Sequence, residues 1–271
     1  MLQLCKPASI LNRLKVWTFK GKWQEEKEIV DNFYKNIMHA YSQIESNKYF
    51  LRIVGYTLGI GNVLNGGTNK GQADGFDLPV LGKLVSMKDN TNQTLLQFIC
   101  KKIAADDEEF PESAKKLLQS VSIKDVDTAY LKTKTGELTA MYAQVRASFA
   151  LVTGGGEPFD RFMEVFEVLL NEANTDLERI KRQLKEVQDK HLFMTAYFGI
   201  EKNNEMNDKS EEFFKVFQSF FKQINDSMPK EQKKKAAPAK SGLQTKPGGA
   251  SNALMAELMA KQAEMAAKEA Q

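Results

Sequence analysis

Residues 61–78, GNVLNGGTNKGQADGFDL, form a stretch rich in glycine and asparagine between two segments of helical character. Seven of the chain's 17 glycines lie between Gly55 and Gly75. Glycine adopts backbone conformations that other residues avoid and lets a second backbone come close, and binding residues concentrate on loops. Two interpretations stay open: a docking loop for another polypeptide, or a long loop without a function of its own.

Upstream of this stretch, apolar residues repeat at helical spacing from Glu25 to about Leu58. They step by three and four at Val30, Phe33, Ile37, Ala40, Ile44, Leu51, Val54 and Leu58. Such a period buries one face of a helix, so the sequence predicts one long helix here. A shorter apolar cluster precedes it, with a predicted break at Gly21.

Downstream, five more helical segments are predicted. Two short ones cover Leu78–Leu84 and Thr94–Ile103, and a third follows Pro111. A fourth starts at a Ser122 and Asp125 capping pair and ends at Gly154–Gly156. The fifth runs from Pro158 to about Met194 with a coiled-coil-like rhythm. No alternation of strand type occurs, so the predicted class is all-α, an elongated helical bundle with long coiled-coil-like helices.

Two groups of aromatic residues need a place in this fold. For Trp17, Phe19 and Trp23, packing in the core is favoured over a role as anchors for a partner. A last helix carries the apolar residues Phe213, Phe214, Val216, Phe217, Phe220, Phe221 and Ile224. At about 25 cal/mol per Å² this surface is too costly to leave in water, so the helix must pack against the bundle or a partner.

The composition changes after the helical body, which is predicted to span residues 1–228. Residues 229–251 are rich in Lys, Ala, Pro and Gly and are predicted to be a disordered, basic linker. Residues 252–271 are predicted to form a short amphipathic helix that bears Leu254, Met255, Leu258 and Met259. The formal charge is +3, but residues 229–271 hold eight lysines and four glutamates, or +4, which leaves −1 for the body. A balanced body argues against binding of nucleic acid.

Residues for catalysis or metal binding do not group together. No set of nucleophile, base and orienting residue stands out, so neither an enzyme nor a cofactor is predicted. His39 and His191 have no nearby cysteine or second histidine, which argues against a metal site. Cys5 and Cys100 are expected to be reduced thiols in apolar surroundings. The sequence has no apolar run of membrane-spanning length and no secretory N-terminus, so an intracellular protein is predicted.

The segments GNVLNGG at 61–67 and GQADGFDL at 71–78 resemble the signature of the formin homology 2 domain. Three further motifs stand in the family's order: RLKVWTFK at 13–20 before the signature, and YFGI at 197–200 and EFF at 212–214 after it. The resemblance therefore covers about residues 8–226. It implies a cytoplasmic protein of the actin cytoskeleton, with actin as partner. It also implies a contribution to nucleation and barbed-end elongation of unbranched actin filaments.

The resemblance also implies two sets of site residues. In the family, two domains join head to tail, and an N-terminal lasso of one encircles the post of the other. The surface that accepts the lasso would comprise Gly61, Asn62, Asn65, Gly66, Gly67, Gly71, Gln72, Ala73, Gly75 and Phe76. Lys83 and Lys88 occupy positions where the family places basic residues near actin, whose surface is acidic. Ordinary solvated lysines are the other interpretation.

The chain departs from the family pattern in what it lacks. It is similar to the coiled-coil and post portion, whereas the lasso, the linker, most of the knob and a proline-rich segment are missing. The expected partner is therefore a formin homology 2 chain, in a homodimer or a heterodimer. Leu254, Met255, Leu258 and Met259 resemble an autoregulatory segment, which implies a regulatory domain as a further partner; a plain Ala-Met helix is the other interpretation. The alternative function is a helical scaffold or dimerisation module that has lost actin assembly activity.

Overall fold

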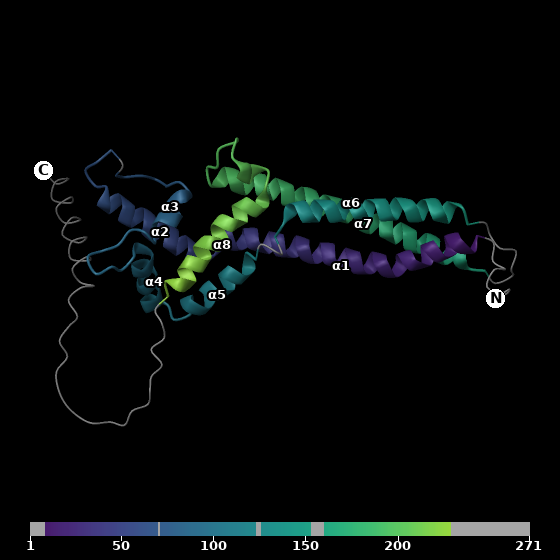
Figure 1. Ribbon diagram of the computed structural model, residues 1–271, viewed down its shortest axis with the longest axis horizontal. Helices are drawn as coiled ribbons and strands as arrows, with labels where there is room; N and C mark the ends of the chain where they lie inside the picture. The colour runs from purple at the N-terminus through teal and green to yellow at the C-terminus, as the bar shows by residue number, and fades with distance from the viewer. Residues whose placement is uncertain (1–8, 70, 123–125, 153–159, 229–271) are drawn as a thin grey trace, which may run out of the picture. The chain divides into compact units, whose positions relative to one another are not determined.

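The computed structural model describes residues 9–69, 71–122, 126–152 and 160–228 (Figure 1). The chain divides into two compact units: unit 1 holds residues up to Glu45 and Gln119–Gln218, and unit 2 holds Ser46–Leu118 and the residues from Ser219 onward. In the described residues all regular structure is helical apart from one isolated bridge between Lys88 and Thr94. The predicted all-α class is therefore confirmed. None of the helices described here combines the length and the apolar character that a membrane span requires.

Unit 1 is built on three long helices that lie side by side: α1 (Ile10–Ser46), α6 (Thr128–Ala150) and α7 (Phe162–Tyr197) (Figure 1). α1 and α7 run in parallel, because their contacts rise together along both helices, from Lys27 with Asp176 to Tyr41 with His191. α6 runs antiparallel to α1, since Trp23 lies 6.3 Å from Tyr142 and Phe33 lies 4.4 Å from Tyr130 between ring centroids.

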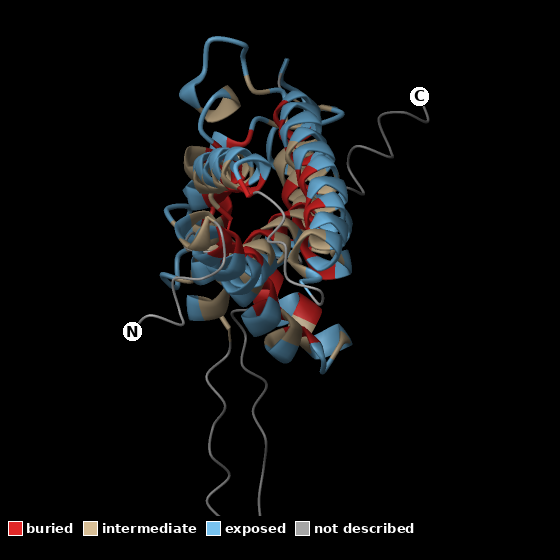
Figure 2. Ribbon diagram, turned by 90° about the vertical axis from the view of Figure 1, so that its right-hand side faces the viewer, coloured by how far each residue is buried: buried red, intermediate tan, exposed pale blue. Residues whose placement is uncertain are grey.

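The core of unit 1 fills the space between the inward faces of these helices (Figure 2). The first half of α8 (Ser210–Asp226) adds phenylalanine rings, with Phe213 and Phe214 centred 6.0 and 4.8 Å from the ring of Tyr41. The rings of α8 that were predicted to need cover are buried, at 2% exposure or less. His191 is a satisfied core residue: its Nδ1 lies 2.8 Å from the Tyr41 hydroxyl, and its Nε2 lies 2.8 Å from the carbonyl of Met206, in the short 3₁₀ helix η2 (Glu205–Asn207).

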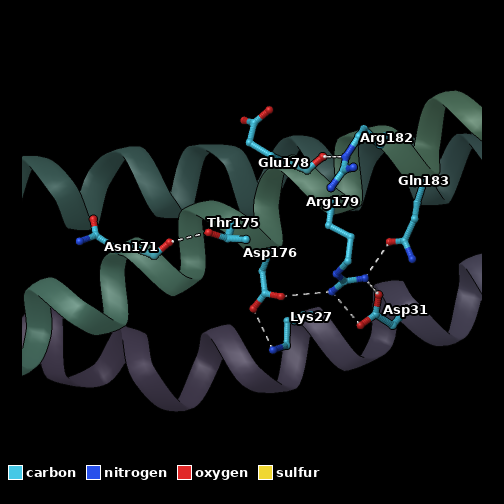
Figure 3. A network of polar contacts seen from close by, with 9 residues as sticks. All are labelled: Lys27, Asp31, Asn171, Thr175, Asp176, Glu178, Arg179, Arg182 and Gln183. Atoms are coloured by element: carbon cyan, nitrogen blue, oxygen red, sulfur yellow. Dashed lines mark hydrogen bonds and ion pairs between the residues drawn. The ribbon is translucent and has the colours of Figure 1, made fainter.

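A polar network fixes the register of α1 against α7 (Figure 3). Arg179 donates to both carboxylate oxygens of Asp31, at 2.5 and 3.1 Å, and also to Gln183 at 3.0 Å. Lys27 donates to Asp176 at 2.9 Å. A two-pronged contact between guanidinium and carboxylate has a defined geometry, so a shift of one turn along either helix would break it.

Unit 2 contains α2 (Lys48–Leu64), α3 (Pro79–Lys83), α4 (Leu95–Asp106), α5 (Phe110–Ser120) and the second half of α8. Phe50 packs edge-on against Phe221 with ring centroids 5.5 Å apart, and Tyr49 packs against Phe110 at 5.2 Å. Thr94 and Gln97 form a capping box at the start of α4, which satisfies two otherwise free amides. Cys100 is buried in this unit, and burial raises the pKa of its thiol to about 12.

Two predicted helix limits before the loop are wrong. α1 continues through Gly21 without a break, because one glycine costs a helix only about 1 kcal/mol and the buried residues on either side hold it. The helix instead ends at Ser46, and α2 starts after Asn47, whose Oδ1 accepts from the amides of Tyr49 and Phe50 at 3.0 and 3.1 Å. This is the geometry of an N-terminal cap.

Other limits shift as well. α2 extends to Leu64, so Gly61 and Asn62 belong to a helix and not to the loop. α6 starts at Thr128 with Asp127 as its cap, not at Ser122. α7 starts at Phe162 and not at Pro158, which lies outside the described residues together with Gly154–Gly156. The predicted linker, the tail helix with Leu254, Met255, Leu258 and Met259, and Cys5 also lie outside them.

The prediction for the tryptophans holds for one of the two. Trp23 is 5% exposed and Phe19 is 4% exposed, so both are core residues. Trp17 is 63% exposed, which contradicts its predicted place in the core. Its ring lies at the edge of the contact between α1 and α7, with its centroid 5.5 Å from that of Phe166.

Candidate docking surface

The ten residues predicted to accept another chain lie at the end of α2 and in the loop behind it. None of them is buried within unit 2. Asn65, Gly67, Gln72 and Gly75 are exposed, and Gly61, Asn62, Gly66, Gly71, Ala73 and Phe76 are half-buried. The structure therefore brings them together on an accessible part of this unit.

Asn62 ties the loop to the last turn of α2. Its amide nitrogen donates to the carbonyl of Ala73 at 2.9 Å, and its Oδ1 accepts from the amide of Ala73 at 2.8 Å. The side chain of Asn62 thus pairs with the N–H and the C=O of Ala73 as a neighbouring β-strand would, across 11 residues of sequence. Because both backbone groups of Ala73 are hydrogen-bonded, this end of the loop has a defined position.

Two glycines in the loop are required by its conformation. Gly67 has a φ of +77°, in the region that side chains disfavour. At Gly71 an added Cβ would lie 2.7 Å from the carbonyl oxygen of Asn65. The same oxygen accepts from the amide of Thr68 at 3.0 Å and from its hydroxyl at 2.7 Å, so it has little freedom to move away.

An apolar groove adjoins the loop. Its floor consists of Ile60 and Leu64 from α2, Met87, and Leu95 and Phe98 from α4, and it holds about 630 Å³ of open space. Leu64 and Met87 are 46% and 44% exposed. Polar side chains border the groove at Lys88, Asp89, Gln93 and Thr94. This combination of apolar floor and polar border suits a large apolar side chain from a partner.

The polar border is shaped by a tight turn. Asp89 accepts from the amide of Thr91 at 2.8 Å, from its hydroxyl at 2.7 Å and from the amide of Gln93 at 2.9 Å. These hydrogen bonds, the Thr91 hydroxyl first among them, lower the pKa of Asp89 below its usual value. The carboxylate therefore keeps its charge and holds the turn closed on the acidic side of neutrality.

Lys83 and Lys88 lie on the segment that leads from α3 to this turn. Lys83 is the last residue of α3, and Lys88 borders the groove. Both are exposed, and neither forms an ion pair with any residue that the structure describes. Their ammonium groups are therefore available to an acidic partner.

The family model of the Formin Homology 2 Domain matches residues 1–225 of the sequence, which include this surface and most of the described helices. This chain belongs to the formin homology 2 family. The family predicted from the glycine-rich signature is thereby confirmed.

The formin homology 2 chain is similar to several formins at low identity. It is 25% identical to Formin-G of Dictyostelium discoideum over 232 residues, or 84% of the chain and 21% of that protein. It is 26% identical to Formin-F of the same organism over 231 residues, or 81% of the chain and 18% of that protein. It is 23% identical to Formin-like protein 21b of Arabidopsis thaliana over 241 residues, or 87% of the chain and 60% of that protein. The chain thus spans about a fifth of the length of the two Dictyostelium relatives.

Sequence reasoning about the formin homology 2 chain missed the groove. Ile60, Leu64, Met87, Leu95 and Phe98 were not among the predicted site residues, although Leu64 stands inside the quoted signature. Leu64 alone could have indicated the groove from the sequence. A large apolar side chain at the end of a helix, next to a glycine loop, is unusual at a position that faces solvent. Its partners across the groove are 23 or more residues away in sequence, and only the fold brings them together.

Proposed function

We propose that this chain is the actin-handling module of a formin, which uses the loop and groove of unit 2 to receive a segment of a second formin homology 2 chain. One observation carries the proposal: the accessible glycine loop, whose base is tied to α2 by Asn62, lies next to an open apolar groove. A preformed surface loses little conformational entropy on binding. Its family membership gives the partner's class, and the exposed Leu64 and Met87 give the chemistry, a segment with large apolar side chains.

In this proposal the paired chains act in actin filament nucleation and barbed-end elongation. Lys83 and Lys88 contribute by attracting the acidic surface of actin, mainly by raising the association rate. The module binds and positions; it does not catalyse a reaction.

The docking step is tested with one groove variant and a control on the same helix. Leu64→Glu places a charge on the groove floor and should abolish binding of this chain to a complete formin homology 2 domain, measured by isothermal titration calorimetry. Leu51→Glu is the control, because Leu51 is 43% exposed on α2 and does not line the groove. Equal binding by both variants would refute docking at this surface.

The actin step is tested separately by fluorescence-monitored actin assembly. Lys83→Glu with Lys88→Glu should reduce the effect of the mixed chains on filament elongation about tenfold at low salt. Lys101→Glu is the control, since Lys101 is an exposed lysine of α4 without an ion pair in the described part of the chain. If the mixture leaves actin assembly unchanged at all concentrations, this part of the proposal is wrong.

The scaffold alternative also has an observation in its favour. Large apolar residues are exposed in unit 1, among them Trp17. A chain that self-associates but has no affinity for actin would support the scaffold, and analytical ultracentrifugation combined with actin co-sedimentation distinguishes the two functions.

A further inference from the structure

A second groove lies on unit 1, between the antiparallel helices α1 and α6, and it holds about 530 Å³ of open space. On each helix the residues that line it recur at spacings of three and four, so each helix turns one face toward it. We define the α1/α6 groove by Lys15, Phe19 and Lys22 of α1 with Met141, Val145 and Ser148 of α6. It follows about two turns of either helix.

The α1/α6 groove has an apolar middle and two basic side chains from α1. Phe19 and Val145, which are 4% and 5% exposed, form its floor. Lys15 and Lys22 are exposed. They stand seven residues apart, which is two turns or about 10.5 Å along the helix. One lysine therefore lies on either side of Phe19 along the groove.

The two lysines have no acidic neighbour across the groove, because the residues of α6 that line it are all neutral. Residues 10–24 of α1 and 138–150 of α6 contain no acidic residue at all. Beyond the groove, Glu26 and Glu137 are both engaged by Lys134. Neither Lys15 nor Lys22 forms an ion pair with any residue that the structure describes.

Other lysines at helix contacts of unit 1 are placed differently. Three of them pair with a carboxylate of the neighbouring helix: Lys27 with Asp176, Lys134 with Glu26, and Lys190 with Glu45. The α1/α6 groove has the same lysines without the carboxylates. Its positive charge is therefore open to groups from outside the described chain.

We propose that the α1/α6 groove binds an acidic amphipathic helix of a partner protein. Such a helix carries two carboxylates seven residues apart, with large apolar residues three and four positions after the first carboxylate. The carboxylates meet Lys15 and Lys22, and the apolar side chains between them cover Phe19 and Val145. Charge complementarity selects the partner and fixes its position along the groove.

The geometry favours a helix over other anions. A single phosphate group reaches one end of the groove and leaves the apolar floor in water. A single-stranded nucleic acid binds to basic grooves that also offer aromatic faces for its bases. Phe19, the aromatic residue of this groove, is buried at 4% exposure and offers no such face.

A designed peptide tests the binding to the full chain. The probe is a fluorescently labelled alanine-based helix of about 20 residues, a length at which isolated helices form. It carries two glutamates seven residues apart and leucines three and four positions after the first. Fluorescence anisotropy should show saturable binding that weakens with salt. A control peptide with its glutamates five residues apart should bind about tenfold more weakly, because its second carboxylate leaves the binding face.

Charge exchange tests the two lysines. Lys15→Glu with Lys22→Glu should weaken binding of the probe about tenfold or more, and a peptide with lysines in place of its glutamates should bind this variant better than the unchanged chain. Lys20→Glu with Lys185→Glu is the matched control, because both lysines are exposed, the change in net charge is equal and neither lines the groove. Leu64→Glu, which tests the docking surface of unit 2, should leave binding of the probe unchanged.

Three results would overturn this inference. They are the absence of saturable binding, equal binding by the unchanged chain and by the Lys15 and Lys22 double variant, and displacement of the probe by inorganic phosphate beyond the effect of sodium chloride at the same ionic strength. Circular dichroism shows whether the variants fold. If the double variant unfolds, the control peptide decides, because equal binding of both peptides would mean that the groove does not recognise carboxylates at helical spacing.

Discussion

Gly71 is the residue of the docking loop at which a side chain has the least room. Gly71→Ala places a methyl group against the Asn65 carbonyl, so the loop must move, and we expect a loss of about 1–3 kcal/mol in the free energy of unfolding. Binding to a complete formin homology 2 domain should weaken with it. Gly75→Ala is the matched control, because a Cβ at Gly75 meets nothing within 4 Å, and its effect should stay within about 0.5 kcal/mol. Urea denaturation measures both, and equal losses would contradict the close approach seen at Gly71.

His191 gives unit 1 a pH dependence. Burial lowers the pKa of His191 below its ordinary value of 6.5, against the opposing effects of the Met206 carbonyl and the charge of Asp208. As the pH falls, the unfolded chain therefore takes up a proton at His191 before the folded chain does. The stability that depends on a neutral His191 is complete above about pH 6.5 and is lost below it. A single titrating group limits the slope of the free energy of unfolding against pH to about 1.4 kcal/mol per pH unit. We expect the melting temperature to fall between pH 7.5 and 5.5 and His191→Gln to flatten that dependence; an unchanged slope in the variant would assign it to other groups.

At the scale of the helices, the misplaced break between α1 and α2 shows what periodicity can and cannot predict. The apolar series Ile44, Leu51, Val54 and Leu58 looks continuous, yet Leu51 is 43% exposed and the buried residues of α2 are Tyr49, Phe50, Ile53 and Thr57. The buried face changes phase at the break. Spacing of three and four tolerates such a shift, because several faces of an apolar helix satisfy it. The type of element was therefore predictable from the sequence, whereas its end depended on one hydrogen-bonding side chain.

Asn47 is that side chain, and its removal should destabilise the start of α2. Asn47→Ala leaves the amides of Tyr49 and Phe50 without their acceptor, so we expect a loss of about 1 kcal/mol in the free energy of unfolding. Asn36→Ala is the control, because Asn36 is exposed inside α1 and alanine is the better helix former there. Chemical denaturation should show a loss for the first variant and no loss for the second. A neutral Asn47→Ala would mean that packing of Tyr49 and Phe50 alone sets the break.

At the scale of the whole molecule, the site was predictable only where it is local in sequence. The loop residues follow one another and carry a family signature, so they could be named in advance. The groove floor combines Ile60 and Leu64 with Met87, Leu95 and Phe98. The contact of α1 with α7 likewise brings Trp17 next to Phe166, 149 residues further along the chain. Such neighbours are set by how helices pack, which a single sequence does not encode in any short pattern. Trp17 illustrates what spacing alone cannot predict. Its spacing along α1 fits a core position, yet the packing of the helices leaves it 63% exposed.

The uneven charge of the whole chain leads to the last prediction. Residues 229–271 carry +4 and the remaining body −1, so truncation after Met228 should leave the melting temperature and the far-ultraviolet circular dichroism of the body unchanged while it weakens binding to actin. We expect about a tenfold loss at low ionic strength, and this loss should vanish in high salt because exposed charges are then screened. Co-sedimentation with actin filaments over a salt series measures this loss of binding.

Replacement of Lys233, Lys234 and Lys235 by Gln in the full chain is the matched test of charge and should reproduce most of the loss. A truncated chain that melts several degrees lower would show that these residues contribute to the fold, and a loss that salt does not reduce would show that they bind actin by contacts other than charge.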